Sequence, residues 1–302
     1  MKKITVSTVL YFTDGIGTKK SEYRDKTGLI SENNRNYSDL VHSYGSKENF
    51  SRFLSDLASF AKEKGYQNSE IRLDKITGEI FKEYLKEKID NGISQKTVSN
   101  IISQAQKLSY ALEKINNDDN VNKFADKNEL IAIKNELRPS AEKIDHVNRG
   151  IENKNVEKII NNITDDKSRI SAILQVKAGL RESEALNIKS WQLKNDNKIE
   201  IQGKGGYHRT IRTDKDTYEK IKNYIHNEGS FKIDRNKYEK ELKTAFSNVG
   251  IEYKGTHALR YTYAQNSFIA KISGGFESKE ALRLVSEELG HHRFDITLHY
   301  LK

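Results

Sequence analysis

The last residues of the chain concentrate side chains that could do chemistry. Between Leu289 and Tyr300, twelve residues include three histidines, one arginine and one tyrosine. His291 and Tyr300 are nine positions apart. In this pattern the tyrosine could be a nucleophile, and the histidine could hydrogen-bond the group that it attacks. The alternative is an ordinary surface tyrosine near a chain end, and this segment alone favours that alternative.

A tyrosine nucleophile needs cations. The phenol has a pKa of about 10, so at neutral pH it attacks poorly until positive charge stabilises the bond that forms. The second half of the chain supplies Arg181, Lys204 between glycines, and His257 with Arg260 three positions later. Each has an ordinary alternative: a surface arginine, a solubilising lysine at a bend, or a chance pair on one helix face. Their combination and order carry the argument.

These residues resemble the tyrosine recombinase (phage integrase) family, and closest is a subgroup of bacterial integrase-like recombinases. The resemblance covers nearly all of residues 151–302, and residues 46–137 look like that family's helical core-binding domain. One departure is Tyr261, where the family commonly has a histidine. The matching segments, in order, are Gly179-Leu180-Arg181 with Glu184, Gly203-Lys204-Gly205, His257-Ala258-Leu259-Arg260, and Leu289-Gly290-His291 with Thr297 and Tyr300.

The resemblance assigns roles to these side chains. The two arginines give forked hydrogen bonds to the non-bridging oxygens of a phosphodiester, which lysine could not reproduce. Lys204 protonates the leaving 5′ oxygen, His257 assists the tyrosine's proton, and His291 holds a non-bridging oxygen. Glu184 orients a cationic partner. Ester energy is kept in a 3′-phosphotyrosine, so neither a metal nor another cofactor is expected. The implied catalytic residues are Arg181, Lys204, His257, Arg260, His291 and Tyr300.

The expected function is site-specific cleavage and rejoining of duplex DNA, in the integration or excision of a mobile element. The expected partners are duplex DNA and further copies of the chain, as a dimer on one site and a tetramer in synapsis. Two alternatives stay open. The first is relaxation of DNA like that of a type IB topoisomerase, since the site is similar. The second is a DNA-binding protein without catalysis, against which the complete catalytic set argues.

Composition is consistent with a polyanionic partner. The 302 residues include 52 basic and 43 acidic side chains, and the sequence pI is about 9.2. Of the net charge of +9, residues 1–150 contribute +3 and residues 151–302 contribute +6. The chain has no cysteine, which excludes a disulfide or a thiolate ligand. No apolar run approaches the ~20 residues of a membrane helix, so a cytoplasmic protein without membrane contact is expected.

The fold class expected is mainly α with a small antiparallel β-sheet. Apolar spacing predicts helices near residues 46–64, 77–91, 94–112 and 126–137, then several more after residue 164. Ile199 and Ile201 alternate toward a glycine-rich bend, which predicts a β-hairpin that returns through residues 208–213 with Lys204 at its tip. The domains are an extension of unclear role (1–44), a helical DNA-binding domain (45–138), a linker (139–153) that opens at Pro139, and a catalytic domain (154–302).

Two further features bear on DNA. Residues 91–112 contain no acidic side chain, so Lys96 and Lys107 on that predicted helix are candidates to contact phosphates. An ordinary polar helix face is an equally good interpretation. Arg209, on the returning strand of the hairpin, is a third candidate for DNA contact. In the extension, Ile4, Val6 and Val9 indicate a strand.

Overall fold

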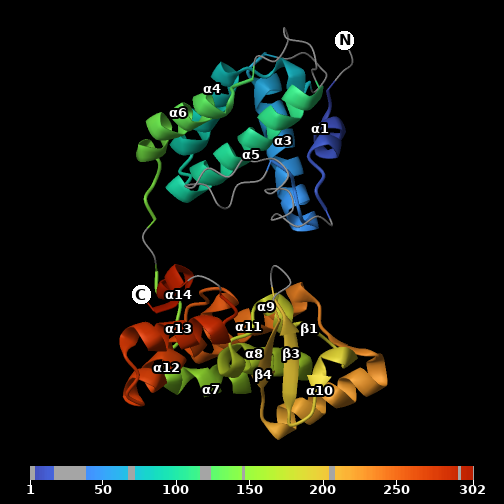
Figure 1. Cartoon of the computed structure of the whole chain (residues 1–302), viewed down its shortest axis with the longest axis vertical. Coiled ribbons are helices and arrows are strands. Elements are labelled where there is room, and N and C mark those ends of the chain that lie inside the picture. The colour runs from blue at the N-terminus through green and yellow to red at the C-terminus, as the bar shows by residue number, and fades with distance from the viewer. Residues whose placement is uncertain are drawn as a thin grey trace. The chain divides into compact units, whose positions relative to one another are not determined.

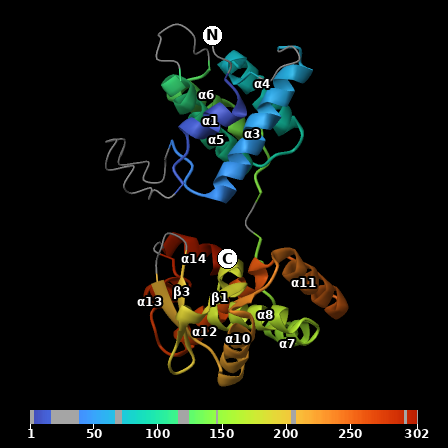
Figure 2. The ribbon, with the colours of Figure 1, turned by 90° about the vertical axis from the view of Figure 1, so that its right-hand side faces the viewer.

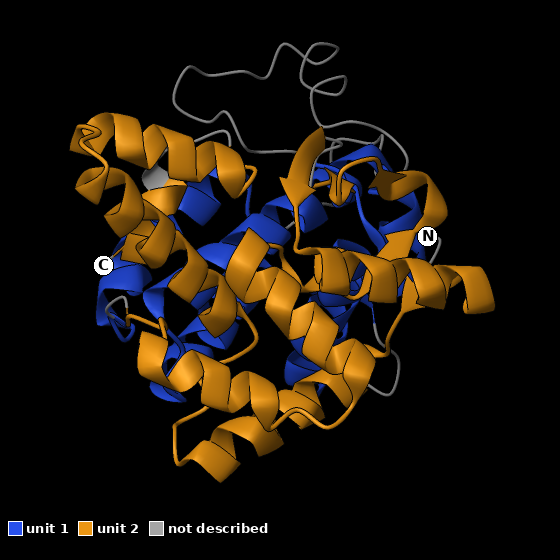
Figure 3. Ribbon diagram, turned by 90° about the horizontal axis from the view of Figure 1, so that it is seen from below, with its two compact units in different colours: residues 1–145 blue, residues 146–302 orange. Residues whose placement is uncertain are grey.

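The chain divides into two compact units. They comprise Met1–Asp145 and His146–Lys302, coloured separately in Figure 3, so the boundary lies inside the predicted linker. Packed structure enters that linker from both ends, because Ala141 is buried in the core of the first unit and Ile151 in that of the second. The computed structural model describes residues 4–16, 39–66, 72–115, 124–144, 147–203, 208–291 and 294–301.

The first unit is built from helices around one apolar core (Figure 1). Four of them confirm the helices predicted from apolar spacing. Helix α4 is capped by Thr77, whose Oγ1 accepts from the backbone N–H of Ile80 at 3.3 Å. Helix α6 begins with the reciprocal pair of Asp126 and Glu129, as their spacing indicates. The helices are α1 (Val6–Phe12), α3 (Tyr44–Glu63), α4 (Gly78–Asp90), α5 (Gln95–Ile115) and α6 (Lys127–Leu137), with 3-10 turns η1 (Leu73–Lys75) and η2 (Arg138–Ser140).

The expectation of a strand near the N-terminus is wrong. Residues Val6–Phe12 form helix α1, which begins with a capping box between Thr5 and Thr8. Ile4 and Val9 are buried in the core of the first unit. β-Branched residues favour strands only when a partner strand is present, and here capping and burial on a helical core outweigh that preference. The described residues 4–16 are therefore part of the first unit.

The second unit is mainly helical with two small antiparallel sheets (Figure 2), which confirms the predicted fold class. One sheet has the order β2-β3-β4 and the other pairs β1 with β5. The helices are α7 (Asn153–Asn161), α8 (Asp166–Ala178), α9 (Glu182–Ala185), α10 (Lys215–Glu228), α11 (Arg235–Val249), α12 (His257–Ser273), α13 (Ser278–Glu288) and α14 (Phe294–Leu301). The strands are β1 (Asn187–Lys189), β2 (Leu193–Lys194), β3 (Lys198–Gln202), β4 (His208–Arg212) and β5 (Ser230–Lys232), with a 3-10 turn η3 (Ser190–Gln192).

The predicted hairpin is formed by β3 and β4. Ile199 pairs with Ile211 and Gln202 with His208, so the apolar residues of both strands face the core. The bend that contains Lys204 lies outside the described residues. Helix α12, which carries His257 and Arg260, packs against α8, α13 and α14, and α14 carries Tyr300. Within the described segments, no helix combines the length and the apolar character that a membrane crossing requires.

Candidate active site

The site begins where helix α8 ends. Gly179 has φ +63°, a left-handed conformation that favours glycine. A Cβ at this position would also lie 2.5 Å from the ring of Tyr263, so a close approach and the backbone conformation both require glycine. The turn leaves the carbonyl of Gly179 accepting from Nη1 of Arg260 and places Arg181 at the start of α9. The glycine in the motif therefore has a backbone role.

Glu184 lies between two guanidinium groups. Its Oε1 accepts from Nη1 of Arg181 at 2.8 Å, and its Oε2 accepts from Nη2 of Arg209 at 2.5 Å. The backbone N–H of Arg181 also donates to Oε2, at 2.8 Å. Burial alone would raise the pKa of Glu184, but hydrogen bonding and charge from Arg209, with those of Arg181, lower it to about 2. The carboxylate is therefore ionised and holds both arginines in place.

Arg209, a candidate for DNA contact, is mostly buried beside Glu184. Its side chain is only 11% exposed and both of its terminal nitrogens are hydrogen-bonded to Glu184. A Cβ on Gly290 would lie 3.0 Å from Nη1 of Arg209, which places this arginine under the turn that precedes His291. Packing turns the side chain toward Glu184, and DNA contact by Arg209 stays a prediction. In this structure Arg209 positions Glu184 and, through it, Arg181.

Arg260 is fully buried, with 0% of its surface exposed. Its Nη2 donates to the carbonyl of Leu289 at 2.6 Å and lies 3.0 Å from Nε2 of His291. Burial and the nearby charge of Arg181 lower the pKa of Arg260 to about 10, so it stays protonated at neutral pH. The Nε atoms of Arg260 and Arg209 are buried without a hydrogen-bond partner in the structure. Helix α12 thus delivers a charged guanidinium to the interior.

His291 is neutral at physiological pH, and its tautomer follows from its neighbours. Desolvation, followed by the charges of Arg260 and Arg181, lowers its pKa to about 3. A guanidinium can only donate, so Nε2 of His291 accepts from Arg260 and the ring proton lies on Nδ1. The N–H at Nδ1 donates a hydrogen bond to Oγ1 of Thr297 on α14, at 2.9 Å. Thr297 is buried, and it links His291 to the helix that carries Tyr300.

Tyr300 lies inside this cluster of side chains from its own chain. Its ring centroid is 4.4 Å from that of Tyr261 and 5.3 Å from that of His291. The guanidinium carbon of Arg260 lies 5.8 Å from the same ring. The side chain is half-buried, which argues against a frayed terminal tyrosine. The position that departs from the family pattern, Tyr261, therefore contacts the candidate nucleophile directly.

His257 is the first residue of helix α12, one turn before Arg260. His257 is exposed, yet desolvation by the surrounding protein and the charge of Arg260 lower its pKa. A neutral imidazole in this place can accept a proton. Lys204 lies outside the described residues, although Gly203 just before it lies near Arg181 and Arg209.

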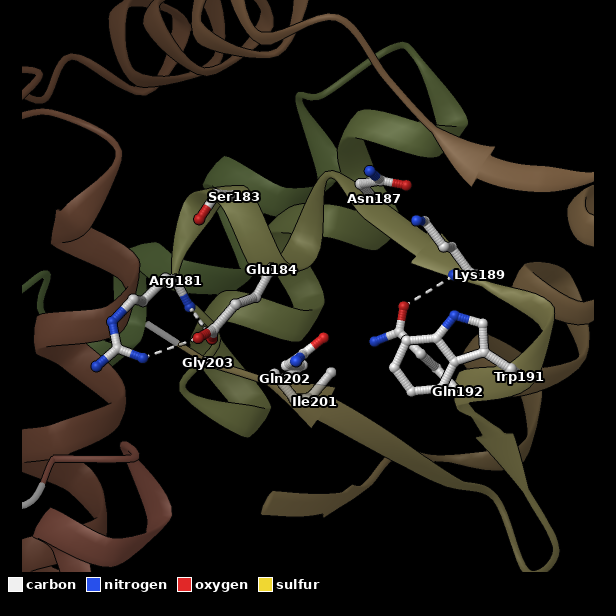
Figure 4. A pocket seen from close by; sticks show the side chains of 10 residues that line it. All are labelled: Arg181, Ser183, Glu184, Asn187, Lys189, Trp191, Gln192, Ile201, Gln202 and Gly203. Carbon is white, nitrogen blue, oxygen red and sulfur yellow. Dashed lines mark hydrogen bonds and ion pairs between the residues drawn. The ribbon is translucent and has the colours of Figure 1, made fainter. Parts of the chain in front are cut away.

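A pocket of about 400 Å³ opens beside Arg181 (Figure 4). The side chain of Arg181 lies at one end with Glu184, and the half-exposed Trp191 lies at the other. Strand residues Asn187 and Gln202 line it between them. Near Arg181 the pocket is lined by the polar side chains of Ser183, Glu184 and Gln202. Among the described residues no cluster of His, Asp and Glu suits a metal ion.

Two residues that contact the site were given no role in the sequence analysis. Thr297 holds His291, and Gln265 donates to the backbone carbonyl of Tyr300 at 3.0 Å. The sequence does indicate that Gln265 lies on the same helix face as the site, because Tyr261 and Gln265 follow His257 at intervals of four. No local pattern indicates which distant backbone atom such a side chain reaches.

The candidate DNA contacts of the first unit lie on helix α5. Lys96, in its first turn, is exposed, and Lys107 is half-buried three turns later. Eleven residues correspond to about three helical turns, so both lysines lie along one side of the helix. DNA binding by this surface stays a prediction.

Comparison with known proteins gives likeness in structure but not in sequence. Neither a protein-family model nor a characterised protein sequence matches this chain. A lambda integrase dimer bound to a COC′ core site matches with a TM-score of 0.62 at 14% identity, covering 100% of this chain and 78% of that chain. XerH site-specific recombinase bound to difH substrate, as a pre-cleavage complex, matches with a TM-score of 0.61 at 17% identity, covering 100% of this chain and 95% of that chain. Tn1549 transposon integrase in complex with transposon right end DNA matches with a TM-score of 0.53 at 15% identity, covering 99% of this chain and 95% of that chain.

These likenesses define the class of fold. The chain has the fold of the tyrosine recombinases, along its whole length. The resemblance read from the short motifs is confirmed at the level of the fold.

Proposed function

We propose that this protein is a tyrosine site-specific recombinase that cleaves and rejoins duplex DNA through a 3′-phosphotyrosine intermediate. One observation carries the proposal: Tyr300 lies against His291 and over the guanidinium of Arg260, within a single chain. A phenol packed beside a buried cation is poised for attack on an anionic ester. The recombinase fold gives that arrangement a known class of reaction.

The proposed chemistry uses six side chains. The phenol oxygen of Tyr300 attacks phosphorus while the bond to the 5′ oxygen breaks, so one ester replaces another. His257 accepts the phenol proton, and Lys204 gives a proton to the 5′ oxygen. Arg181 and Arg260 stabilise the charge on the non-bridging oxygens, the kind of interaction that is worth ~3–4 kcal/mol per donor in well-studied sites. His291 can donate to a non-bridging oxygen only after Nε2 gains a proton, because in the phosphate-free structure that nitrogen accepts from Arg260.

The proposed biological setting follows from the same likeness. We propose that the protein integrates or excises a mobile element in the cytoplasm of a bacterial cell. The similarity to a transposon integrase bound to transposon end DNA supports this role. We also propose that copies of the chain act together, as a dimer on one site and a tetramer in synapsis, because rejoining two duplexes requires four cleavages. The lambda integrase likeness, which is a dimer on DNA, supports that assembly.

The proposal is tested by covalent capture. Binding sites are first selected from random duplexes, and a selected site is then nicked beside the cleavage position so that rejoining is prevented. Wild-type protein should form a species that survives denaturing electrophoresis, and Tyr300→Phe should bind the same duplex without forming it. Tyr11→Phe is the control and should form the adduct, since it removes a hydroxyl from an exposed tyrosine of helix α1 in the first unit. Adduct formation by Tyr300→Phe would overturn the assignment, and sequence-independent relaxation of supercoiled DNA would favour a topoisomerase.

A further inference from the structure

One side chain, Gln265 on helix α12, hydrogen-bonds two parts of the second unit that are far apart in sequence. Its Nε2 donates to the backbone carbonyl of Tyr300 at 3.0 Å and to Oδ1 of Asn148 at 2.9 Å. An amide nitrogen carries two hydrogens, so each contact uses one of them. Asn148 belongs to the segment that joins the two compact units, and Tyr300 is the candidate nucleophile. A single amide group therefore bridges the linker and the nucleophile's backbone.

The linker end of this bridge is fixed by other contacts. Oδ1 of Asn148 also accepts from the backbone N–H of Gly150 at 2.7 Å, and the carbonyl of Asn148 accepts from Lys254 at 3.4 Å. The N–H of Ile151 donates to Oγ1 of Thr262 at 2.8 Å, one turn before Gln265 on the same helix. The segment from Asn148 to Ile151 is thus held along the first half of α12.

Gly150 makes this approach possible. A Cβ at this position would lie 2.1 Å from Oε1 and 2.9 Å from Cδ of Gln265. Gly150 is not among the glycines with positive φ, so its backbone conformation would accept alanine. A side chain at Gly150 would therefore collide first with Gln265, and its Cβ would also lie 3.1 Å from Oδ1 of Asn148, the other partner in the bridge. Substitution there is a steric probe of the bridge.

The nucleophile end of the bridge is the last turn of α14. The Tyr300 ring already packs on Tyr261 and beside Arg260, but ring packing leaves the backbone free to slide along the helix axis. The hydrogen bond from Gln265 to the carbonyl of Tyr300 fixes that backbone. A misplacement of about 1 Å in a reacting group can cost roughly 100-fold in rate, so a contact of this kind matters to the reaction.

We propose that Gln265 is a positioning residue, which couples the linker segment at Asn148–Gly150 to the placement of Tyr300. The coupling rests on the proposed function, in that Tyr300 is the nucleophile. A shift of the linker withdraws Asn148 from the amide, Gln265 loses one of its two anchors, and the hydrogen bond to Tyr300 weakens. Cleavage then depends on the conformation of the linker.

The first test is the isosteric variant Gln265→Glu, which keeps the shape and removes both donors. With saturating nicked duplex, its single-turnover rate of adduct formation should fall roughly tenfold or more, while DNA affinity stays within about twofold. The matched control is Asn266→Asp. Asn266 is the next residue on α12 and donates to Asn153 at 2.7 Å, so the same chemical change removes a similar contact that does not reach Tyr300. A normal rate in Gln265→Glu would overturn the proposal.

The second test is a double-mutant cycle. Gly150→Ala should displace the Gln265 side chain and slow adduct formation by a factor similar to that of Gln265→Ala. Once Gln265 is alanine, adding Gly150→Ala should change the rate less than twofold, because the two act through one contact. Fully multiplicative effects would show that Gly150 acts elsewhere, which would overturn the coupling.

The third measurement does not depend on catalysis. Amide hydrogen exchange in the DNA-free protein should be faster in α14 for Gln265→Glu than for wild type, and unchanged for Asn266→Asp. Unchanged exchange in α14 for Gln265→Glu would overturn the inference even if the protein is a recombinase. If wild type forms no adduct, the proposed function fails, and faster exchange would then still assign the bridge to Gln265.

Discussion

The guanidinium of Arg260 donates to the imidazole of His291, with Nη2 and Nε2 3.0 Å apart in the interior of the second unit. This contact decides the protonation state of His291. Because the arginine cannot accept, Nε2 is unprotonated, and the Nδ1 proton is directed to Thr297. Arg260 lies on helix α12 and His291 in the turn between α13 and α14. The protonation state of His291 therefore depends on tertiary packing and not on its neighbours in the sequence.

The depressed pKa of His291 makes stability depend on pH. The group titrates at about 3 in the folded chain and near its ordinary value of about 6.5 when unfolded. Between these values the unfolded state binds more protons, so stability is full above pH 6.5 and is lost as pH falls. At pH 5 the loss from this residue should be about 2 kcal/mol. Urea unfolding of wild type and His291→Gln at pH 5 and pH 7 should show a pH-dependent difference of that size. His226→Gln, on the exposed surface of α10, is the control, and an equal difference for it would contradict the prediction.

Lysine should not replace either of the two arginines that we propose to be catalytic. Arg181→Lys and Arg260→Lys keep the positive charge but lose the pair of parallel N–H donors that a guanidinium offers to two phosphate oxygens. Adduct formation should therefore slow by about 100-fold or more. Their stabilities should differ, because Arg260 is fully buried and bonds two backbone carbonyls, whereas Arg181 is 22% exposed. Thermal unfolding should show a lower Tm for Arg260→Lys and little change for Arg181→Lys. An Arg181→Lys rate close to that of wild type would remove that residue from the proposed chemistry.

Glu184→Gln should destabilise the second unit. The carboxylate compensates Arg181 and Arg209, and breaking a buried pair costs about 3–5 kcal/mol. Because the pKa of Glu184 is lowered to about 2, its stabilising effect is complete above about pH 4.5 and decreases as pH falls toward 2. Denaturant unfolding should therefore show a difference between wild type and Glu184→Gln that narrows below about pH 4. The control is Glu287→Gln, which removes an exposed ion pair with Arg283 and should have little effect on stability. If the stability difference between wild type and Glu184→Gln stays constant with pH, the assignment of a lowered pKa to Glu184 is contradicted.

The acid-free run of helix α5 predicts phosphate contacts. Lys96→Ala and Lys107→Ala should each weaken DNA binding and flatten the slope of log affinity against log salt by about 0.9, because each phosphate contact releases counterions. Cleavage at saturating DNA should survive. Lys86→Ala on helix α4 is the control for loss of a lysine elsewhere in the first unit. Unchanged affinity and slope in the double variant would mean that the helix presents only a polar surface.

The elements of this protein were predictable because their signals are local. Helix α6 has its capping pair three residues apart, and the β3–β4 hairpin has its alternation on either side of a glycine-rich bend. Caps, turns and one-face spacing act within a few residues, so a single sequence contains them. The order of the catalytic motifs was readable for the same reason. The N-terminal helix α1 was missed because burial against the first unit's core, a non-local effect, outweighed the β-branched residues.

Which side chains meet was decided by tertiary structure. Arg209 faces Glu184 rather than solvent because the turn at Gly290 lies over β4, and Gln265 meets Asn148 across 117 positions of sequence. The contact of Tyr300 with Arg260 likewise depends on how α14 packs on α12. Residue types and spacing determine what chemistry is available. Distances between groups on separate helices depend on the packing of the whole unit, which minimises cavities and unpaired polar atoms together rather than one segment at a time.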